Sequence, residues 1–517
     1  MKKGVKRSYV TISLMIAATL FSKALGMARG MMLAWRLGDS AEAAAFAAAS
    51  KIPGAIFDLL FSAAILGCFI PIYNEARAKS ENDAYEYSSV FFSAVTAVCA
   101  LFSVLGALFA PQMISLVSPG ISEQASSLAA SLLRIMFPMM IFTAGAYTLT
   151  GILQSAERFI LPAAISALSN GAMILYLIIA GESFSVYTLS LVFVFSWFLQ
   201  FLTLALPLIF NKQMPRPCFK LKNEYLLRSV KTAPQIMAGS WLAPASVLIA
   251  SFFSSFVSDG TFVAYDYSIG LYTIIAGIAV YGVGNFVFPS LSRLAAQKDG
   301  DSFAKSARKA VFSIILMILP VFAAVFTLSY EGIALLYLRD NFTEELARTC
   351  ALSLRTLALS MPAYALSEIF YRVFYAAGKV RIPMYATLTA ICACIICNVL
   401  LLFVFETGLF GISLSYSVAQ IVYALSMALM GRKHFPEIFT LKKGKAHHLA
   451  IGGALCLATM VLCERFIPIF SSINASLAIF LKIAIVFILG LVIYLLYILI
   501  TRTLEEKKPS IQRGEWI

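Results

Sequence analysis

The feature that most constrains this chain is a series of apolar runs of roughly 20 residues, each long enough to cross the ~30 Å hydrocarbon core of a bilayer as a helix. Hydrophobic residues make up 60% of the 517 positions, charged residues make up 13%, and the mean hydropathy is +0.86. A water-soluble core cannot accommodate such an apolar excess. The alternating pattern of membrane β-strands is absent from the sequence. The sequence therefore predicts an all-α polytopic membrane protein.

We predict about fourteen transmembrane helices, with errors of several residues at each end. They are expected at residues 9–35, 43–72, 87–110, 127–152, 159–180, 185–210, 232–257, 262–290, 309–336, 350–376, 382–405, 408–430, 448–470 and 474–501. Residues 1–7 before the first run imitate a secretory signal, but the run continues through Lys23 and Arg29 without a cleavage site, so we expect an uncleaved first helix.

The loops between these runs carry an alternating charge pattern. Loops such as 211–231 and 432–445 are rich in Lys and Arg, whereas 111–127 and 181–185 contain neither. The alternation predicts that both termini lie in the cytoplasm. The formal net charge of +14 is spread over many short loops rather than gathered in one domain, so it indicates membrane topology and no nucleic-acid partner.

An internal repeat is visible in two basic turns closed by proline. Residues 154–162 (QSAERFILP) recur in outline as 376–383 (AAGKVRIP), and 69–71 (FIP) recur as 287–289 (VFP). This predicts two six-helix lobes of equal direction, related by a parallel repeat, plus two C-terminal helices. The predicted parts are an N-terminal lobe (1–210), a basic cytoplasmic linker (211–231), a C-terminal lobe (232–431), and a basic loop, helices 13 and 14 and a tail (432–517). Parallel halves of this kind are a transporter architecture, in which one half rocks against the other.

Three basic residues inside the first two runs are the main candidates for a binding site. Lys23 and Arg29 are six residues apart, nearly two turns, so we expect them on about the same helix face, and Gly26 between them is expected to ease close helix approach. Lys51 lies two residues before Pro53 and Gly54, where we expect the helix to break. Gly26, Pro53 and Gly54 are the expected hinges.

Intramembrane cations cost roughly 2.5–3.5 kcal/mol each on insertion scales, so they usually face water or a partner. Three cations from two adjacent helices suit an anion such as a lipid-linked phosphate or pyrophosphate. The alternative is that they snorkel to the headgroup layer.

Other intramembrane charges have simpler explanations. Glu368 and Arg372 are expected to form a structural i,i+4 ion pair on one helix face. Asp58 and Asp266 are candidates for binding a coupling cation or for balancing the basic residues. Three further cations are expected to snorkel: Arg134, Arg355 and Lys482.

Signatures of soluble enzymes are missing. There is no Walker loop, no dinucleotide-binding fingerprint after a strand and no His-Glu-x-x-His helix. His434, His447 and His448 share one basic loop and indicate a solvated cluster, and the Cys392/Cys394/Cys397 spacing indicates packing. No catalytic residue and no metal site are predicted.

Several dispersed motifs resemble the MurJ/MviN lipid II flippase family. They follow the family order at 21–29 (FSKALGMAR), 51–53 (KIP), 69–75 (FIPIYNE), 158–163 (RFILPA), 288–293 (FPSLSR) and 371–378 (YRVFYAAG), spanning most of the first twelve helices. The resemblance implies a fold of the multidrug/oligosaccharidyl-lipid/polysaccharide exporter type. It also implies movement of undecaprenyl-pyrophosphate-linked peptidoglycan precursor from the cytoplasmic to the outer leaflet of the bacterial inner membrane.

The resemblance also assigns residues. Lys23, Arg29 and Lys51 match family cavity arginines, so the charge is kept but two bidentate forks are lost. Asp266 matches an acidic position that the family follows with arginine, which is Tyr267 here. Family acidic positions in and near the second helix appear as Ala44 and Ala63. Because of these departures, the resemblance supports a lipid-linked oligosaccharide flippase more firmly than it supports lipid II as the substrate.

Our hypothesis is alternating access, with the pyrophosphate on the basic trio and the polyprenyl tail in lipid. No cofactor is expected beyond a coupling cation, Na⁺ or H⁺, or the membrane potential. The expected partners are the undecaprenyl-linked glycolipid, the bilayer and, as candidates, peptidoglycan-synthesis proteins. The alternatives are a cation-coupled multidrug exporter of the same superfamily, a non-transport envelope scaffold, and, ranked last, an intramembrane glycosyltransferase using Asp58 and Asp266.

Overall fold

The computed structural model describes residues 2–62, 64–220, 222–297, 299–439, 443–467 and 474–506. These residues are helical or lie in turns and loops, and this described part contains no strand. The chain divides into two compact units, Met1–Asp266 and Tyr267–Ile517, and the division falls inside one continuous helix, α12 (Asp259–Ala296). The predicted all-helical fold is confirmed.

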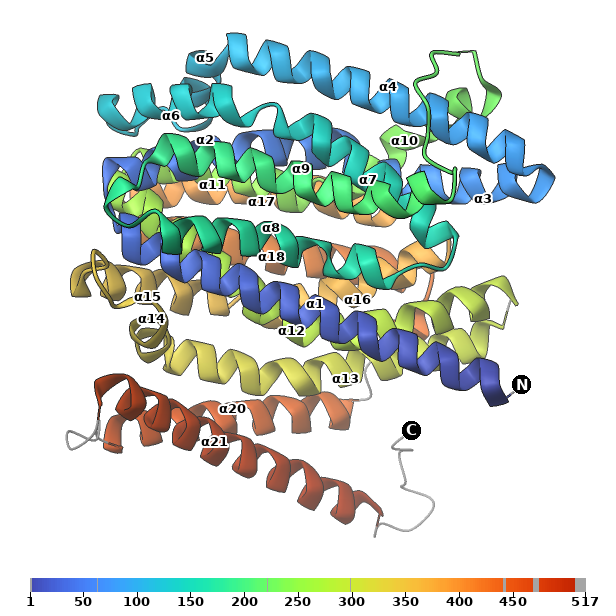
Figure 1. The fold of residues 1–517 in the computed structure, drawn as a ribbon. Coiled ribbons are helices and arrows are strands. Elements are labelled where there is room, and N and C mark those ends of the chain that lie inside the picture. The colour runs from blue at the N-terminus through green and yellow to red at the C-terminus, as the bar shows by residue number, and fades with distance from the viewer. Residues whose placement is uncertain are drawn as a thin grey trace. The chain divides into compact units, whose positions relative to one another are not determined.

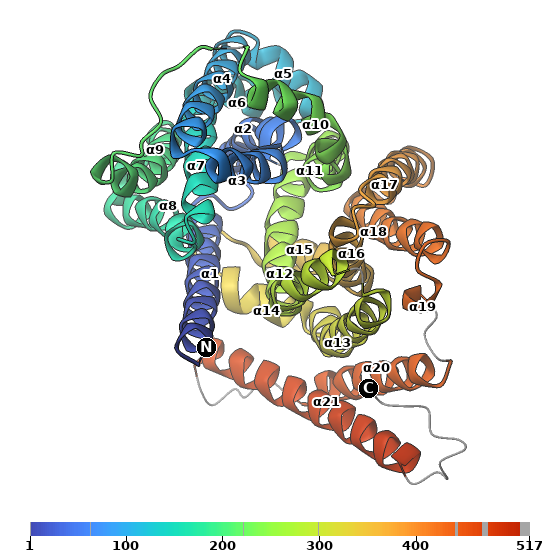
Figure 2. The same cartoon turned by 90° about the vertical axis from the view of Figure 1, so that its right-hand side faces the viewer.

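The first unit is a bundle of long helices joined by short ones (Figures 1 and 2). In it α1 packs on α8, α8 on α9, α9 on α7, and α2 on α6. In chain order the elements are α1 (Lys2–Leu37), α2 (Ala41–Phe57), η1 (Asp58–Ser62), η2 (Ile65–Phe69), α3 (Ile70–Lys79), α4 (Glu81–Leu108), α5 (Ala110–Val117), α6 (Glu123–Met136), α7 (Met139–Ser155), α8 (Ile160–Ile179), η3 (Gly181–Ser183), α9 (Val186–Phe210), α10 (Glu224–Ser240) and α11 (Leu242–Ser255).

Capping residues account for where several of these helices begin. Gly38, at φ 55°, follows the end of α1, and the Ser40 side chain then accepts a hydrogen bond from the Ala43 N–H to start α2. Seven consecutive residues of α2, 43–49, are buried. Six of them are alanine, and side chains this small let neighbouring helices approach α2 on every side.

Two π-helical turns, η1 and η2, follow α2. A π turn leaves backbone groups without their usual α-helical partners, so another donor is needed in an apolar setting. The Trp241 indole, between α10 and α11, donates to the Leu59 carbonyl at 2.8 Å. The irregular backbone at η1 is therefore satisfied by a side chain from α10–α11.

The second unit contains the rest of α12 and a second set of helices. Here α17 packs on α18, α13 on α16 and α20, and α20 on α21. The two last helices lie side by side in both views (Figures 1 and 2). The elements are α13 (Gly300–Thr327), α14 (Ser329–Tyr337), α15 (Glu344–Ala358), α16 (Met361–Ala376), α17 (Arg381–Val399), η4 (Leu400–Val404), α18 (Gly408–Arg432), α19 (Pro436–Phe439), α20 (Lys443–Phe466) and α21 (Ala475–Glu506).

Among the described residues, ten helices are long and apolar enough to span a membrane, and α6 with α7, bent by 44°, could form an eleventh span. The three remaining predicted spans fall on α1, on α10–α11 and on α15–α16. The last two are each broken near the middle, which leaves no single helix of full length, and α1 carries charges within its apolar stretch. The protein is a multi-pass membrane protein, and the count of about fourteen stays a prediction.

The backbone geometry repeats at the two predicted basic turns. After α7, Glu157 has φ 59°, and after α16, Gly378 has φ 68°. The next residues, Arg158 and Lys379, donate their N–H groups to carbonyls five residues earlier at 2.9 and 2.8 Å. Both turns are thus the same left-handed helix C-cap, in which the orphan carbonyls of the last turn are satisfied. The sequence similarity between the two turns reflects this shared geometry.

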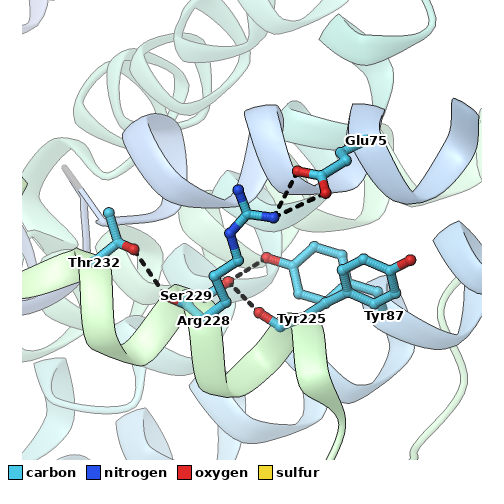
Figure 3. A network of polar contacts seen from close by, with 6 residues as sticks. All are labelled: Glu75, Tyr87, Tyr225, Arg228, Ser229 and Thr232. Carbon is cyan, nitrogen blue, oxygen red and sulfur yellow. Dashed lines mark hydrogen bonds and ion pairs between the residues drawn. The ribbon is translucent and has the colours of Figure 1, made fainter. Parts of the chain in front are cut away.

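A polar network joins the start of α10 to α3 and α4 (Figure 3). Arg228 Nη1 lies 2.9 and 2.7 Å from the two carboxylate oxygens of Glu75. The Tyr87 hydroxyl lies 2.6 Å from Ser229 Oγ, and the Tyr87 ring packs on Tyr225 at 5.7 Å. The segment that we predicted as a linker therefore ends in a helix fastened to the first unit, although the repeat assigns the span 232–257 to the second half.

A mutation at Gly120 tests the packing of the loop between α5 and α6. A Cβ atom there would lie 2.6 Å from the Ser255 carbonyl oxygen, a backbone atom that cannot move aside cheaply. We expect Gly120→Ala to destabilise the protein by about 1–3 kcal/mol, as overpacking does, measured as a lower thermal unfolding temperature in detergent. Gly171→Ala is the control, because nothing lies within 4 Å of its Cβ position. Equal stability of the two variants would contradict the packing.

Candidate functional site

Arg29 projects from α1 toward α8 and is under-satisfied. Its Nη1 lies 3.9 Å from Met173 Sδ, a weak acceptor. Its Nε is buried and has no hydrogen-bond partner among the described residues. Leaving a buried charged donor unpaired is costly, so such a group is suited to meeting an acceptor supplied by a ligand.

Lys51 and Asp266 form an ion pair within the first unit. The distance from Lys51 Nζ to Asp266 Oδ1 is 2.8 Å, and the two side chains are 16% and 31% exposed. Lys51 Nζ also lies 4.8 Å from the centroid of the Phe262 ring, one helical turn before Asp266. Asp266 further interacts electrostatically with Arg29. The structure thus gathers two of the three predicted cations around one carboxylate.

Lys23 is half-buried on α1. In this continuous helix the six-residue spacing places it about 120° around from Arg29, so the expectation that the two share a face is wrong. Gly26 lies where α1 meets α8, because a Cβ atom there would be 3.3 Å from Asn170 Nδ2. The Asn170 amide donates to the Ser22 carbonyl at 3.2 Å, which fixes α8 against α1. Gly26 therefore permits close packing, and α1 is continuous through it.

The expected break at Pro53 and Gly54 is not where the helix becomes irregular. The α2 helix runs through both residues to Phe57, and the π turn begins at Asp58. Pro53 is buried, while Asp58 is exposed at the start of η1. The structure brings Asp266 to the basic residues, and no ion pair of Asp58 is found within the described part of the chain. A hinge role for Gly26, Pro53 and Gly54 stays a prediction about motion.

The remaining predicted residues are placed as follows. Arg372 Nη1 lies 2.6 Å from Glu368 Oε2 one turn away on α16. Tyr267, which stands where the family has arginine, stacks on Tyr337 at 5.9 Å, so this position serves aromatic packing. Ala44 is fully buried in α2, and Ala63 lies outside the described residues.

The expectation that Lys482 snorkels to the headgroups is wrong. Lys482 is 8% exposed and lies 2.8 Å from Glu331 Oε1 and 3.1 Å from Glu464 Oε1, on α14 and α20. Its two carboxylate partners come from distant parts of the sequence, and no local pattern around Lys482 reveals them. Arg134 and Arg355 are exposed, which is compatible with snorkelling.

Sequence reasoning missed Phe262 and Met173, which contact Lys51 and Arg29. The only available signal for Phe262 was its position four residues before Asp266, which places both on one helix face. The described residues contain no group of three His, Cys, Asp or Glu side chains that could hold a metal ion.

The fold is that of a known class of membrane transporters. The chain is similar to a solved structure described as "Lipid II flippase MurJ, inward closed conformation", with a TM-score of 0.80 and 20% identity, over 95% of this chain and 99% of that chain. It is also similar to an inward-facing multidrug resistance MATE family transporter, with a TM-score of 0.67 and 15% identity, over 81% and 95% of the two chains. The predicted exporter-type fold is therefore confirmed.

The family is narrower than the fold. The family model described as "Lipid II flippase MurJ" matches residues 33–503, so this chain belongs to that family. A curated relative from Thermotoga maritima, named a probable lipid II flippase MurJ, is 24% identical over 506 residues, covering 96% of this chain and 97% of the relative. The resemblance drawn from the dispersed motifs is confirmed, and the protein is a transporter rather than an enzyme.

Proposed function

We propose that this protein is a lipid II flippase, which moves the undecaprenyl-pyrophosphate-linked peptidoglycan precursor from the cytoplasmic to the outer leaflet of the bacterial inner membrane. The observation that carries the proposal is the family match over residues 33–503. The curated relatives named as probable lipid II flippases match 80–96% of the chain and support the same substrate.

The buried basic residues support a phosphate-bearing substrate. A pyrophosphate offers several anionic oxygens, and charge-assisted hydrogen bonds from guanidinium and ammonium groups can replace the hydration it loses. Arg29 on α1 contributes an unsatisfied buried donor, and Lys51 on α2 contributes an ammonium group that is paired with Asp266. In this mechanism the pyrophosphate binds Arg29, Lys51 and Lys23, the polyprenyl tail stays in lipid, and alternation of the two halves exposes the headgroup outside.

The energy source in this mechanism is the membrane potential or a cation gradient. An inside-negative potential pulls exposed cationic groups inward by ~2.3 kcal/mol per charge per 100 mV, so it could reset an empty carrier. Both termini then lie in the cytoplasm, as the basic loops predict. Peptidoglycan-synthesis proteins are the candidate partners, because they would supply or consume the flipped lipid.

A multidrug exporter is the second candidate, because the fold is shared with MATE transporters. Binding of cationic drugs favours acidic or aromatic groups, whereas a cluster of Arg29, Lys51 and a single carboxylate disfavours a cationic substrate. The basic cluster therefore favours an anionic substrate.

The test is complementation in a bacterium depleted of its own lipid II flippase. We expect this chain to restore the fraction of lipid II that a membrane-impermeant lipid II-cleaving enzyme can reach from outside. Unchanged accessibility on expression of well-folded protein would overturn the proposal. Drug resistance without restored lipid II accessibility would favour the exporter.

A further inference from the structure

In the Lys51–Asp266 pair, a carboxylate already occupies the ammonium group that a phosphate-bearing substrate would bind. Lys51 Nζ is 2.8 Å from Asp266 Oδ1 and is capped by the Phe262 ring. Both α12 residues therefore contact the same ammonium group. A phosphate that binds there would bring a second anion beside the Asp266 carboxylate, and repulsion between the two anions favours exchange of one for the other.

The cluster of Lys51, Arg29 and Asp266 contains two positive charges and one negative charge. One carboxylate, Asp266, faces two cations, Lys51 at contact distance and Arg29 through electrostatic interaction. Arg29 still has a buried Nε without a hydrogen-bond acceptor. A carboxylate has two oxygens, whereas a pyrophosphate has more acceptors and more charge, so it could satisfy both cations at once.

The pair also restrains a particular stretch of helix. The first unit ends at Asp266, and α12 continues from there into the second unit. Two polar contacts, about two turns apart, help to hold α12 within the first unit. At its first residue, the Asp259 carboxylate accepts bonds from the Ser122 N–H at 2.9 Å and the Ser122 hydroxyl at 2.5 Å, and two turns later Asp266 binds Lys51.

We propose that Asp266 is an internal counter-anion, which occupies Lys51 in the empty carrier and is displaced by the phosphate groups of the substrate, freeing the Asp266 turn of α12. This inference rests on the proposed function. The exchange swaps one anion for another at Lys51, and no covalent bond is made or broken. Loss of the Lys51 contact removes one of the two polar contacts described above and leaves the Asp259 contact and the packing of the buried residues 262–265. Binding is thereby linked to the helix that continues from one compact unit into the next.

A double-mutant cycle tests the exchange on full-length protein in lipid nanodiscs, with undecaprenyl pyrophosphate as the probe. We expect Asp266→Asn to tighten binding about tenfold, the effect of roughly one partly buried charge interaction. Lys51→Gln should weaken binding by a similar factor. In the Lys51→Gln background, Asp266→Asn should change affinity less than about threefold, because the competition for Lys51 is gone.

Each contrary outcome has a distinct meaning. Weaker binding by Asp266→Asn, or an equal gain in both backgrounds, would overturn the exchange while leaving the proposed function intact. No binding of undecaprenyl pyrophosphate by the unmodified protein would overturn both. Glu368→Gln is the matched control, since it removes another intramembrane ion pair, with Arg372, and should leave the affinity unchanged.

A measurement on the unmodified protein covers the case in which Asp266→Asn does not fold. Hydrogen exchange of the backbone amides of residues 259–266 should rise when undecaprenyl pyrophosphate is added, because the Lys51 contact is lost. Unchanged or slower exchange in this segment, at saturating probe, would overturn the proposal.

Discussion

Replacing Arg29 with alanine is expected to abolish lipid II flipping and to lower the affinity for undecaprenyl pyrophosphate by about 30-fold or more. Removing one member of a buried, hydrogen-bonded charge pair typically costs about 2–5 kcal/mol, and every 1.4 kcal/mol is tenfold. Arg29 is suited to this role because its guanidinium is held in the α1–α8 interface while its Nε has no partner within the described protein. Flipping is measured by outer-leaflet lipid II accessibility, and affinity by titration in nanodiscs.

Two further variants sharpen this prediction. Arg29→Lys keeps the charge but loses the planar fork, so it should retain part of the affinity. Arg134→Ala is the control, because Arg134 is an exposed arginine of α6 in the same unit, and it should leave flipping unchanged. If Arg29→Ala folds and flips at the normal rate, the anion site is not at Arg29.

Replacing Lys482 with methionine should destabilise the second unit by about 3–5 kcal/mol, the usual cost of leaving a buried charge without its partner. Glu331 is 7% exposed and would lose its 2.8 Å contact, while Glu464, at 35%, is nearer the surface. The neighbouring cluster between α13, α20 and α21, which includes Met460, Val486 and Tyr494, is largely apolar, and the Tyr494 hydroxyl already donates to the Leu316 carbonyl. Thermal unfolding in detergent measures the effect.

Two companion variants test whether the loss of stability comes from leaving a buried charge without its partner. Lys482→Met with Glu331→Gln should recover much of the lost stability, because the uncompensated charge is removed. Arg348→Met removes an i,i+4 contact of the same class, 2.7 Å from Glu344, but both side chains are more than half exposed. It should shift the unfolding temperature little, since exposed ion pairs contribute little. A Lys482→Met protein as stable as the Arg348→Met protein would contradict the buried cluster.

The sequence predicted the elements better than it predicted their partners. Apolar run length located the long helices to within several residues, whereas their starts are set by caps such as Ser40 before α2 and Thr343 before α15, which the run lengths do not reveal. The pairing of Lys51 with Asp266 and of Lys482 with Glu331 joins residues far apart in the chain. Such pairing is decided by how helices pack, which periodicity does not encode.

The irregular stretch of the second predicted span also depends on a distant residue that the local sequence does not reveal. Pro53 and Gly54 are conspicuous in the sequence, yet α2 passes through them and the π turns begin after Phe57. Helix irregularity there depends on a donor for the freed carbonyl of Leu59, which Trp241 supplies from α10–α11. The residue that satisfies this backbone therefore lies in a distant part of the sequence.

The packing of α10 and α11 against the first unit has a consequence for biogenesis. Because α11 packs on α2 and α5, and Trp241 completes the backbone of η1, the first half of the chain cannot reach its final fold when its own six predicted spans have been synthesised. It must wait, with the apolar faces of α2 and η1 uncovered, until the ribosome has passed residue 255. Nascent chains that stall before that residue would be early targets for membrane quality control.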